Sequence, residues 1–226
     1  CTPFQETVYA LLDQSHVLAV IRKQSTEFLN KISSRDDVLL IDLDNTFDSL
    51  SCIIMASGIS KRFGANKLLA DFNGKTLFEN TVSESQLVKF SYTLAVTRHH
   101  EIARICDYSG IDCLLHDLPF RNDMIRLGVS HILENSKPDG ILFLPSDQPL
   151  ISRTSIQLLC LTFLYYKDKI CRLSYNNTGG SPVMFPSIYF DELMRLPEKK
   201  GGGYIIKKNS GQVILVPARN EIEMYD

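Results

Sequence analysis

The chain has 226 residues, of which 44% are hydrophobic and 22% are charged, an ordinary composition for a globular protein. The formal net charge of −2 argues against nucleic acid as a partner, because no basic field would attract its phosphates. No apolar run reaches the roughly 20 residues that a membrane-spanning helix needs, and no basic-then-apolar signal pattern opens the chain. We therefore expect a soluble enzyme without a membrane partner.

Residues 1–50 are expected to form a small, separate α/β segment. A capping box with proline at the first helical position, Thr2-Pro3-Phe4-Gln5, predicts a helix through Leu12. A strand at Val17–Ile21, a short helix at Thr26–Ile32 and a strand at Val38–Leu43 follow. The segment loosely resembles the closing part of a P-loop nucleoside triphosphatase domain, without its phosphate loop. The chain begins with Cys1 rather than Met, so we expect a piece of a longer protein.

Strands and helices alternate from Ser51 onward, and we expect residues 51–226 to form one domain. Strands are predicted at 52–56, 92–97, 112–115, 140–145, 170–174, 182–185 and 213–217. Helices are predicted at 76–89, 100–108, 123–135, 152–166, 187–196 and 203–209. This alternation predicts an α/β fold with a mostly parallel sheet and helices on both faces. Ligands of such sheets bind beyond the carboxyl ends of the strands.

The stretch IIMASGISKRFGANK, residues 53–67, joins a short apolar strand to a loop of small and basic residues. Small residues let backbone amides approach an anion, and the cations neutralise charge that amides alone cannot. The loop is neither a Walker loop nor a G-x-G-x-x-G dinucleotide motif. It predicts a triphosphate site whose residues are Ala56, Ser57, Gly58, Ser60, Arg62 and Lys67.

A second motif, ILFLPSDQPL at residues 141–150, places Asp147 just past the end of a buried strand. A carboxylate there faces the ligand crevice, where its hard oxygens suit Mg²⁺ bound to phosphate. A lone Asp at a strand end is more often a turn or cap residue. Because a triphosphate loop is predicted independently, we interpret Asp147 as a metal ligand.

Both motifs resemble those of known nucleotidyltransferases. Residues 56–67 are similar to the signature L-A-A-G-x-S-x-R-x-G-x-x-K of enzymes that activate sugars, methylerythritol and molybdopterin, with Ser57 in place of the second Ala. SDQPL resembles the metal-binding G-D-Q-P-L of molybdenum cofactor cytidylyltransferases, with Ser146 replacing Gly. Their G-H-P-V-L-F is similar to Gly180–Phe185, where Ser181 replaces His, and their closing D-x-D-T resembles Glu223–Asp226.

The resemblance implies a Rossmann-like nucleotidyltransferase fold and a Mg²⁺-dependent reaction. A nucleotide, favoured as CMP from CTP, would pass to the phosphate of molybdopterin with release of pyrophosphate. Arg62 and Lys67 would stabilise the leaving group, and Asp147 and Asp226 would bind the metal. A molybdoenzyme that takes up the finished cofactor is a further expected partner.

Two segments depart from the family pattern and leave alternatives open. Residues 121–128 replace the family's G-M-x-S-S-L-x-x-G near the expected acceptor site; Arg126 is interpreted as solvated, whereas Arg121 suits a phosphate or solvent equally. Residues 197–203, PEKKGGG, form either a surface turn or a loop near the substrate. The alternatives are a guanylyl- or sugar-phosphate nucleotidyltransferase, or a non-catalytic module that binds nucleotide or cofactor for a molybdenum hydroxylase.

A competing motif, VLLIDLDNT at residues 38–46, fits the nucleophile motif of haloacid dehalogenase-type phosphatases. Asp42 and Asp44 would then take the phosphoryl group and bind Mg²⁺. That fold needs further catalytic residues on later strands of the same sheet, and here a complete nucleotide-binding strand follows instead. We therefore interpret Asp42 and Asp44 as a strand end and turn.

The cysteines and histidines predict neither a disulfide framework nor a zinc site. The six cysteines are Cys1, Cys52, Cys106, Cys113, Cys160 and Cys171; they include no Cys-x-x-Cys pair and lie mostly in apolar segments. Reduced core thiols of this kind predict a cytoplasmic protein. The histidines are His16, His99, His100, His116 and His131, and we interpret them as surface or core residues.

Overall fold

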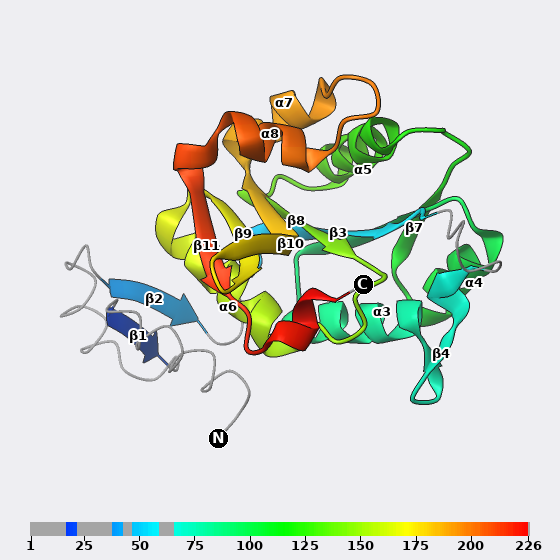
Figure 1. The fold of residues 1–226 in the computed structure, drawn as a ribbon, viewed down its shortest axis with the longest axis horizontal. Coiled ribbons are helices and arrows are strands. Elements are labelled where there is room, and N and C mark those ends of the chain that lie inside the picture. The colour runs from blue at the N-terminus through cyan, green and yellow to red at the C-terminus, as the bar shows by residue number, and fades with distance from the viewer. Residues whose placement is uncertain (1–16, 22–37, 43–46, 59–65, 226) are drawn as a thin grey trace.

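The structure is a computed structural model that describes residues 17–21, 38–42, 47–58 and 66–225. Its main body is a seven-stranded sheet with helices on both faces (Figure 1). In spatial order the strands are β11 (Val213–Pro217), β9 (Ile170–Tyr175), β10 (Thr178–Pro186), β8 (Gly140–Pro145), β3 (Leu50–Ala56), β6 (Tyr92–Thr97) and β7 (Asp112–Leu115). The order confirms the α/β fold class, and β3, the strand before the predicted phosphate loop, lies between β8 and β6.

Most strand pairs are parallel, as predicted. β3 pairs in parallel with both β6 and β8, β6 with β7, and β11 with β9. Only β10 runs against its neighbours β8 and β9 among the strands that this sheet contains. The carboxyl ends of β3, β6, β7 and β8 therefore meet at one edge of the sheet, where ligands of this architecture bind.

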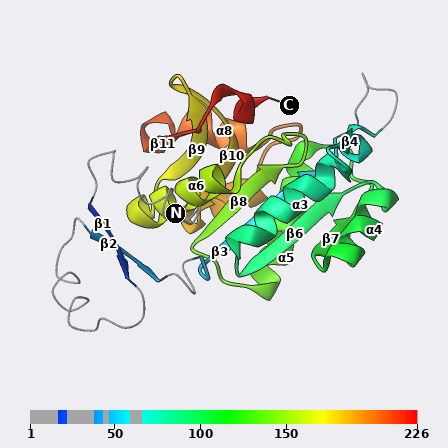
Figure 2. The ribbon, with the colours of Figure 1, turned by 90° about the horizontal axis from the view of Figure 1, so that it is seen from below.

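The helices cover the sheet in two layers, which Figure 2 shows from below. They are α3 (Leu77–Val88), α4 (His100–Ser109), α5 (Arg121–Asn135), α6 (Arg153–Tyr166), α7 (Phe190–Met194) and α8 (Gly202–Lys208). Buried residues of α3, α4 and α6 form one core cluster, and those of α5, α7 and α8 form the other.

Strand β3 shows how the sequence supplies both cores at once. Cys52, Ile54 and Ala56 belong to the cluster with α3, α4 and α6, whereas Ile53 belongs to the cluster with α5. Successive strand residues point to opposite faces of a sheet, so a continuous apolar run suits a strand that helices cover on both sides.

Helix α3 begins where its sequence indicates. The Thr76 hydroxyl accepts from the Glu79 amide at 3.1 Å, and the Glu79 carboxylate accepts from the Thr76 amide at 2.7 Å, which completes a capping box. The short hairpin before it, β4 (Asp71–Phe72) and β5 (Lys75–Thr76), turns at Asn73 and Gly74, both with positive φ. We did not predict this hairpin, although Asn-Gly is a strong hairpin signal.

The C-terminal third corrects two predicted elements. β10 extends over residues 178–186 rather than 182–185, because a turn at Asn176 and Asn177 pairs its first half with β9. The helix predicted at 187–196 is two short elements, the 3₁₀ turn η2 (Ser187–Tyr189) and α7. The segment PEKKGGG leads directly into α8, since Gly202 and Gly203 are its first residues.

The N-terminal strands β1 (Val17–Ile21) and β2 (Val38–Asp42) pair in parallel as a separate two-stranded sheet. Both strands were predicted, and Asp42 ends β2. The helices predicted before Leu12 and at Thr26–Ile32 lie outside the described residues, as does Asp44.

Within the described ranges, no helix has the length and apolar character needed to cross a bilayer. The described cysteines are free thiols: Cys52, Cys106, Cys160 and Cys171 are buried, and Cys113 is partly buried.

Candidate functional site

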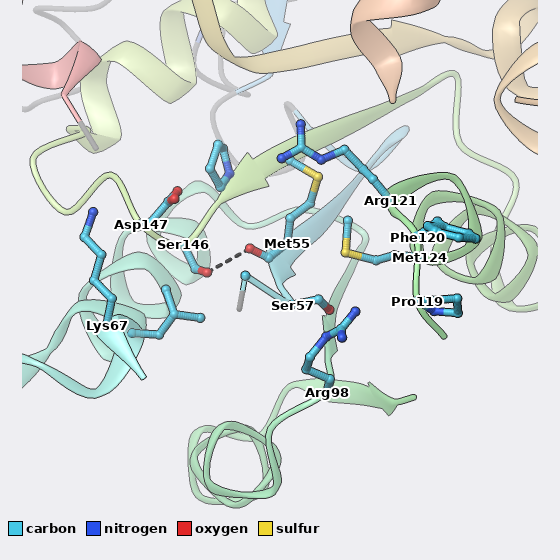
Figure 3. A pocket seen from close by; sticks show the side chains of 13 residues that line it. Met55, Ser57, Lys67, Arg98, Pro119, Phe120, Arg121, Met124, Ser146 and Asp147 are labelled. Carbon is cyan, nitrogen blue, oxygen red and sulfur yellow. Dashed lines mark hydrogen bonds between the residues drawn. The ribbon is translucent and has the colours of Figure 1, made fainter. Parts of the chain in front are cut away.

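A cavity of about 310 Å³ opens at the carboxyl edge of the sheet. It is lined by the ends of β3, β6 and β8, by the 3₁₀ turn η1 (Lys67–Leu69) and by the start of α5. Figure 3 shows Lys67 and Asp147 together on one side of this cavity and Phe120, Arg121 and Met124 on the other. The cavity thus has one side suited to phosphate and metal and one side with aromatic, apolar and cationic groups.

Asp147 reaches this cavity because hydrogen bonds of the preceding residue, Ser146, fix the chain where it leaves β8. Ser146, which is 1% exposed, donates from its amide and its hydroxyl to the Met55 carbonyl, at 3.3 and 2.8 Å. These bonds tie the end of β8 to the end of β3. The Asp147 carboxylate therefore lies at the cavity, on the same side as Lys67, rather than continuing the sheet (Figure 3).

Lys67 enters the cavity from the first residue of η1. The side chain of Asn66 caps this turn, since its Oδ1 accepts from the Leu68 amide at 3.2 Å. Leu68 is buried in the core and fixes the turn in place. The ammonium of Lys67 is consequently presented on the same side as Asp147 (Figure 3).

Ser57 is held by a neutral histidine. The Leu118 amide donates to Nδ1 of His116 at 3.1 Å, so this nitrogen accepts and the proton lies on Nε2. Nε2 is 2.8 Å from Ser57 Oγ, to which it donates, and the Ser57 hydroxyl donates to the Val96 carbonyl at 3.1 Å. Burial and the charge of Arg98 lower the pKa of His116, which favours this neutral form.

The end of β6 holds the residues on either side of Ser57. The Thr97 hydroxyl donates to the Ala56 carbonyl at 2.8 Å, and Nε2 of His99 lies 3.0 Å from the Gly58 carbonyl. Thr97 and Ala56 are fully buried. Three consecutive residues at the start of the loop are therefore fixed by β6 and the segment that follows β7.

Arg98 adds a cation to the floor of the cavity. Its Nη2 donates to the Leu118 carbonyl at 2.9 Å, and its buried Nε has no hydrogen-bond partner among the described residues. A buried donor without a partner is costly, so a ligand acceptor at this position would be favourable.

The start of α5 faces the same cavity. Phe120 is its N-cap residue and makes no side-chain capping bond, and Arg121 and Met124 line the cavity from the first turn. The first amides of a helix lack partners within the helix and favour anions.

The structure brings together four of the residues predicted from the sequence: Ser57, Gly58, Lys67 and Asp147. Ala56 is buried behind them and does not line the cavity, so a direct nucleotide contact for Ala56 stays a prediction. Ser60, Arg62 and Asp226 lie outside the described residues. Arg126 is exposed and pairs with Asp123 at 3.0 Å, as its solvated interpretation expects.

Sequence reasoning missed Arg98, His99 and His116, which we had not assigned to the site. Arg98 and His116 directly follow the predicted strands 92–97 and 112–115, and His99 is one residue further, at the sheet edge where ligands of this architecture bind. Their position after those strands was the signal that could have identified them.

The donor set suits a metal that is bound partly by substrate. No group of three or more His, Cys, Asp or Glu side chains gathers anywhere in the described ranges. Among the residues that the structure describes, Asp147 is the one that supplies a carboxylate to the cavity. Mg²⁺ commonly binds through one or two carboxylates together with substrate phosphates and water, so this site fits such an ion.

Residues 52–213 match the family described as the MobA-like NTP transferase domain. The chain belongs to this family, in agreement with the resemblance that its motifs carry. The match begins inside β3 and ends at the first residue of β11, and it includes the whole cavity.

One curated relative and several solved structures are similar to this chain, the structures in fold. A "Probable molybdenum cofactor guanylyltransferase" of Aquifex aeolicus is 26% identical over 106 residues, 47% of this chain; the chain spans about half of that relative, 50%. The crystal structure of Rv0371c from Mycobacterium tuberculosis has a TM-score of 0.66 at 19% identity and covers 75% of this chain and 88% of its own; a second structure of Rv0371c is a manganese complex. A cytidylyltransferase of Leptospira borgpetersenii has a TM-score of 0.64 at 17% identity and covers 79% of each chain.

Proposed function

We propose that the chain transfers a nucleotide from a nucleoside triphosphate to the phosphate of a molybdopterin-type acceptor. The observation that carries the proposal is the cavity itself, in which Lys67 and Asp147 lie on one side and a helix N-terminus with Arg121 on the other. The family match and the name of the Aquifex relative support nucleotide transfer in molybdenum cofactor synthesis.

The reaction follows from charge. An oxygen of the acceptor phosphate forms a bond to the α-phosphorus, the bond from that phosphorus to the oxygen bridging to the β-phosphorus breaks, and pyrophosphate leaves with the electron pair. Lys67 and Arg62, with the amides around Ser57 and Gly58, would stabilise the negative charge on pyrophosphate. No side-chain nucleophile takes part, so positioning and electrostatics supply the catalysis.

Asp147 would hold the divalent ion, with Asp226 as the second proposed ligand. Bound Mg²⁺ would lower the repulsion between the two approaching anions. The contribution of Asp147 is to present a carboxylate that the Ser146 bonds fix at the edge of the sheet.

For the donor we propose CTP, because DQPL and SPVMF resemble motifs of the cytidylyltransferases. GTP is the second candidate, since the Aquifex relative is named as a guanylyltransferase. A thermal-shift comparison of CTP, GTP and ATP with Mg²⁺ tests both, because the nucleotide with the highest affinity raises the melting temperature most. A larger shift with GTP would replace CTP by GTP in the proposal.

Turnover separates an enzyme from a binding module. Release of pyrophosphate with Mg²⁺, nucleotide and cofactor is expected for the transferase. Nucleotide protection against unfolding without turnover would instead identify a module that carries nucleotide or cofactor to a molybdoenzyme.

A further inference from the structure

The loop predicted to bind triphosphate begins with a residue that a side chain, rather than the sheet, holds in place. β3 pairs with β6 up to Ala56 and with β8 up to Met55, so Ser57 lies beyond both ladders. Its hydroxyl oxygen accepts from Nε2 of His116 at 2.8 Å, and its hydroxyl donates to the Val96 carbonyl at 3.1 Å. The position of Ser57 at the cavity therefore depends on a residue that follows a different strand, β7 (Figure 3).

The ring of His116 is in turn fixed by Leu118. The Leu118 amide donates to Nδ1 of the ring at 3.1 Å, and the Leu118 carbonyl accepts from Nη2 of Arg98 at 2.9 Å. Pro119 follows and restricts the backbone of Leu118 to extended conformations. The Leu118 amide consequently has little freedom to turn away from the ring.

The pair of Ser57 and His116 is not a nucleophile with its base. A serine hydroxyl beside a histidine nitrogen resembles such a pair, but the base must then accept the hydroxyl proton. Here Nδ1 accepts from Leu118, so Nε2 carries a proton and donates to Ser57. The contact is suited to hold Ser57 in place and not to activate it.

The surroundings of His116 favour the neutral ring. Burial is the main cause that lowers its pKa, and the charge of Arg98 and, more weakly, that of His99 act in the same direction. The carboxylates of Asp117 and Asp123 act in the opposite direction and do not offset these effects. The arrangement seen in the structure is therefore the one present at neutral pH.

Protonation of the ring is incompatible with this arrangement. A charged imidazole has an N–H on both nitrogens, so Nδ1–H would face the N–H of Leu118. Because Arg98 and the following proline restrain Leu118, the ring has to move, and the bond from Nε2 to Ser57 would be lost with it.

The second histidine at the loop does not respond in this way. Nε2 of His99 lies 3.0 Å from the Gly58 carbonyl, which can only accept, so Nε2 carries a proton in the neutral and in the charged ring. Protonation of His99 preserves its contact, whereas protonation of His116 removes one.

We propose that His116 is a positioning residue for the nucleotide: its neutral ring holds Ser57 and Gly58 in the arrangement that binds triphosphate, and protonation of the ring releases them. The proposal rests on the proposed nucleotide transfer and adds control of the same site by pH. Nucleotide affinity should be constant above the ordinary histidine pKa of about 6.5 and should fall as the pH decreases below it.

The test measures the dissociation constant of CTP with Mg²⁺ by calorimetric titration between about pH 8 and about pH 5. It compares the wild-type chain with His116→Gln, since glutamine keeps an N–H donor for Ser57 but takes up no proton. We expect the affinity of the wild-type chain to fall about tenfold relative to that of His116→Gln over this range. The nucleotide and the metal titrate equally in both experiments, so the ratio removes their contribution.

Two further variants and a nucleotide-free measurement keep the test decisive. Ser57→Ala removes the hydroxyl that joins the ring to the loop, so its affinity should have the same flat pH profile as that of His116→Gln. His131→Gln is the matched control, because Nε2 of His131 lies 3.0 Å from the hydroxyl of Tyr92, the first residue of β6, and it should keep the wild-type profile. The ¹⁵N shifts of the His116 ring should show a proton on Nε2, and melting curves at each pH verify that every variant is folded.

The outcomes separate this proposal from the proposed function. Equal pH profiles of the wild-type chain and His116→Gln would refute the positioning role, as would a proton on Nδ1 of the neutral ring. Wild-type affinity that rises toward low pH relative to the variant would also refute it, because a charged ring would then simply attract the triphosphate.

Absence of nucleotide binding at every pH would refute the proposed function, and hydrogen exchange of residues 54–58 would then decide on His116. Faster exchange in the wild-type chain than in His116→Gln at about pH 5 would support His116 as the residue that holds this part of the chain. Equal exchange in the two proteins would refute it.

Discussion

The buried carboxylate of Glu223 allows a quantitative test of how the C-terminus is attached to the site. Glu223 is 2% exposed and lies in the 3₁₀ turn η4 (Glu221–Met224). It accepts from the Ser155 hydroxyl at 2.5 Å and from the Ser152 and Arg219 amides, both at 3.3 Å. Two of these donors belong to the start of α6, where a negative charge is favourable.

The expected loss follows from these three bonds. A hydrogen bond to a charged group contributes about 1.5–3 kcal/mol, and two of the bonds of Glu223 are long, so we expect Glu223→Ala to cost about 3–5 kcal/mol. For a chain of this size, that loss lowers the melting temperature by about 6–20 °C. Glu221→Ala changes an exposed residue of the same turn and should have little effect.

Denaturant titration and thermal melting measure both variants, and turnover at limiting Mg²⁺ adds a functional readout. Asp226 follows this turn by two residues, and the Gln148 side chain also donates to the Met224 carbonyl at 3.3 Å. We therefore expect Glu223→Ala to require more Mg²⁺ for half-maximal turnover. A stability loss below about 1 kcal/mol would refute the argument that Glu223 anchors the C-terminal turn.

Four further predictions test the site. Gly58→Ala should leave the melting temperature unchanged, because its Cβ would meet no atom of the described residues within 4 Å, and should weaken nucleotide binding in a titration if a ligand fills that space. Asp147→Asn should lower turnover by orders of magnitude while metal-independent nucleotide binding persists, and Asp42→Asn should alter neither; the reverse pattern would favour the phosphatase motif. The pKa of His116 is lowered in the folded chain, so the unfolded chain takes up the proton first as the pH falls. The stability that neutral His116 contributes is therefore present above the ordinary histidine pKa and is lost as the pH falls below about 6.5. The melting temperature of His116→Gln should lack this part of the pH dependence. Deletion of residues 1–50 should leave nucleotide-dependent melting shifts intact, and their loss in a folded variant would place the proposed domain boundary elsewhere.

Local sequence patterns were sufficient to locate the strands of the main sheet, although not the β4–β5 hairpin or the division of 187–196 into η2 and α7. The seven strands of the main sheet all overlap their predicted ranges, because each is an apolar run with polar or turn residues on both sides. The direction of a strand could not be predicted in the same way, because nothing within Pro182–Phe185 indicates that β10 runs antiparallel to β8. Direction there depends on the turn at Asn176 and Asn177, which two residues with positive φ make possible.

The site was predicted in part because its residues carry two kinds of signal. Lys67 and Asp147 have side chains whose chemistry suits phosphate and metal, so a sequence motif identifies them. His116 and Arg98 have roles that come from their neighbours: His116 acts on Ser57 through one hydrogen bond, and Arg98 has a buried Nε that only the packed structure shows.

The register of the strands explains why residues found by motif and residues found only in the structure lie at the same site. Ala56 pairs with Thr97, Thr97 pairs with Leu115, and Met55 pairs with Pro145. Because Met55 pairs with Pro145, Asp147 is level with Ser57, and the row one position beyond Ala56, Thr97 and Leu115 contains Ser57, Arg98, His116 and Asp147. Each of these four either lines the cavity or is hydrogen-bonded to a residue that does.

The site is therefore a single row of residues just past the register line of four parallel strands. Once the order and the register of the strands are known, this row can be written from the sequence, including the histidine and the arginine that motifs did not identify. Arg172 is not part of this row, because it lies in the middle of β9, which the antiparallel strand β10 separates from β8. The position of Arg172 therefore follows from packing, whereas the row at the end of the strands follows from register.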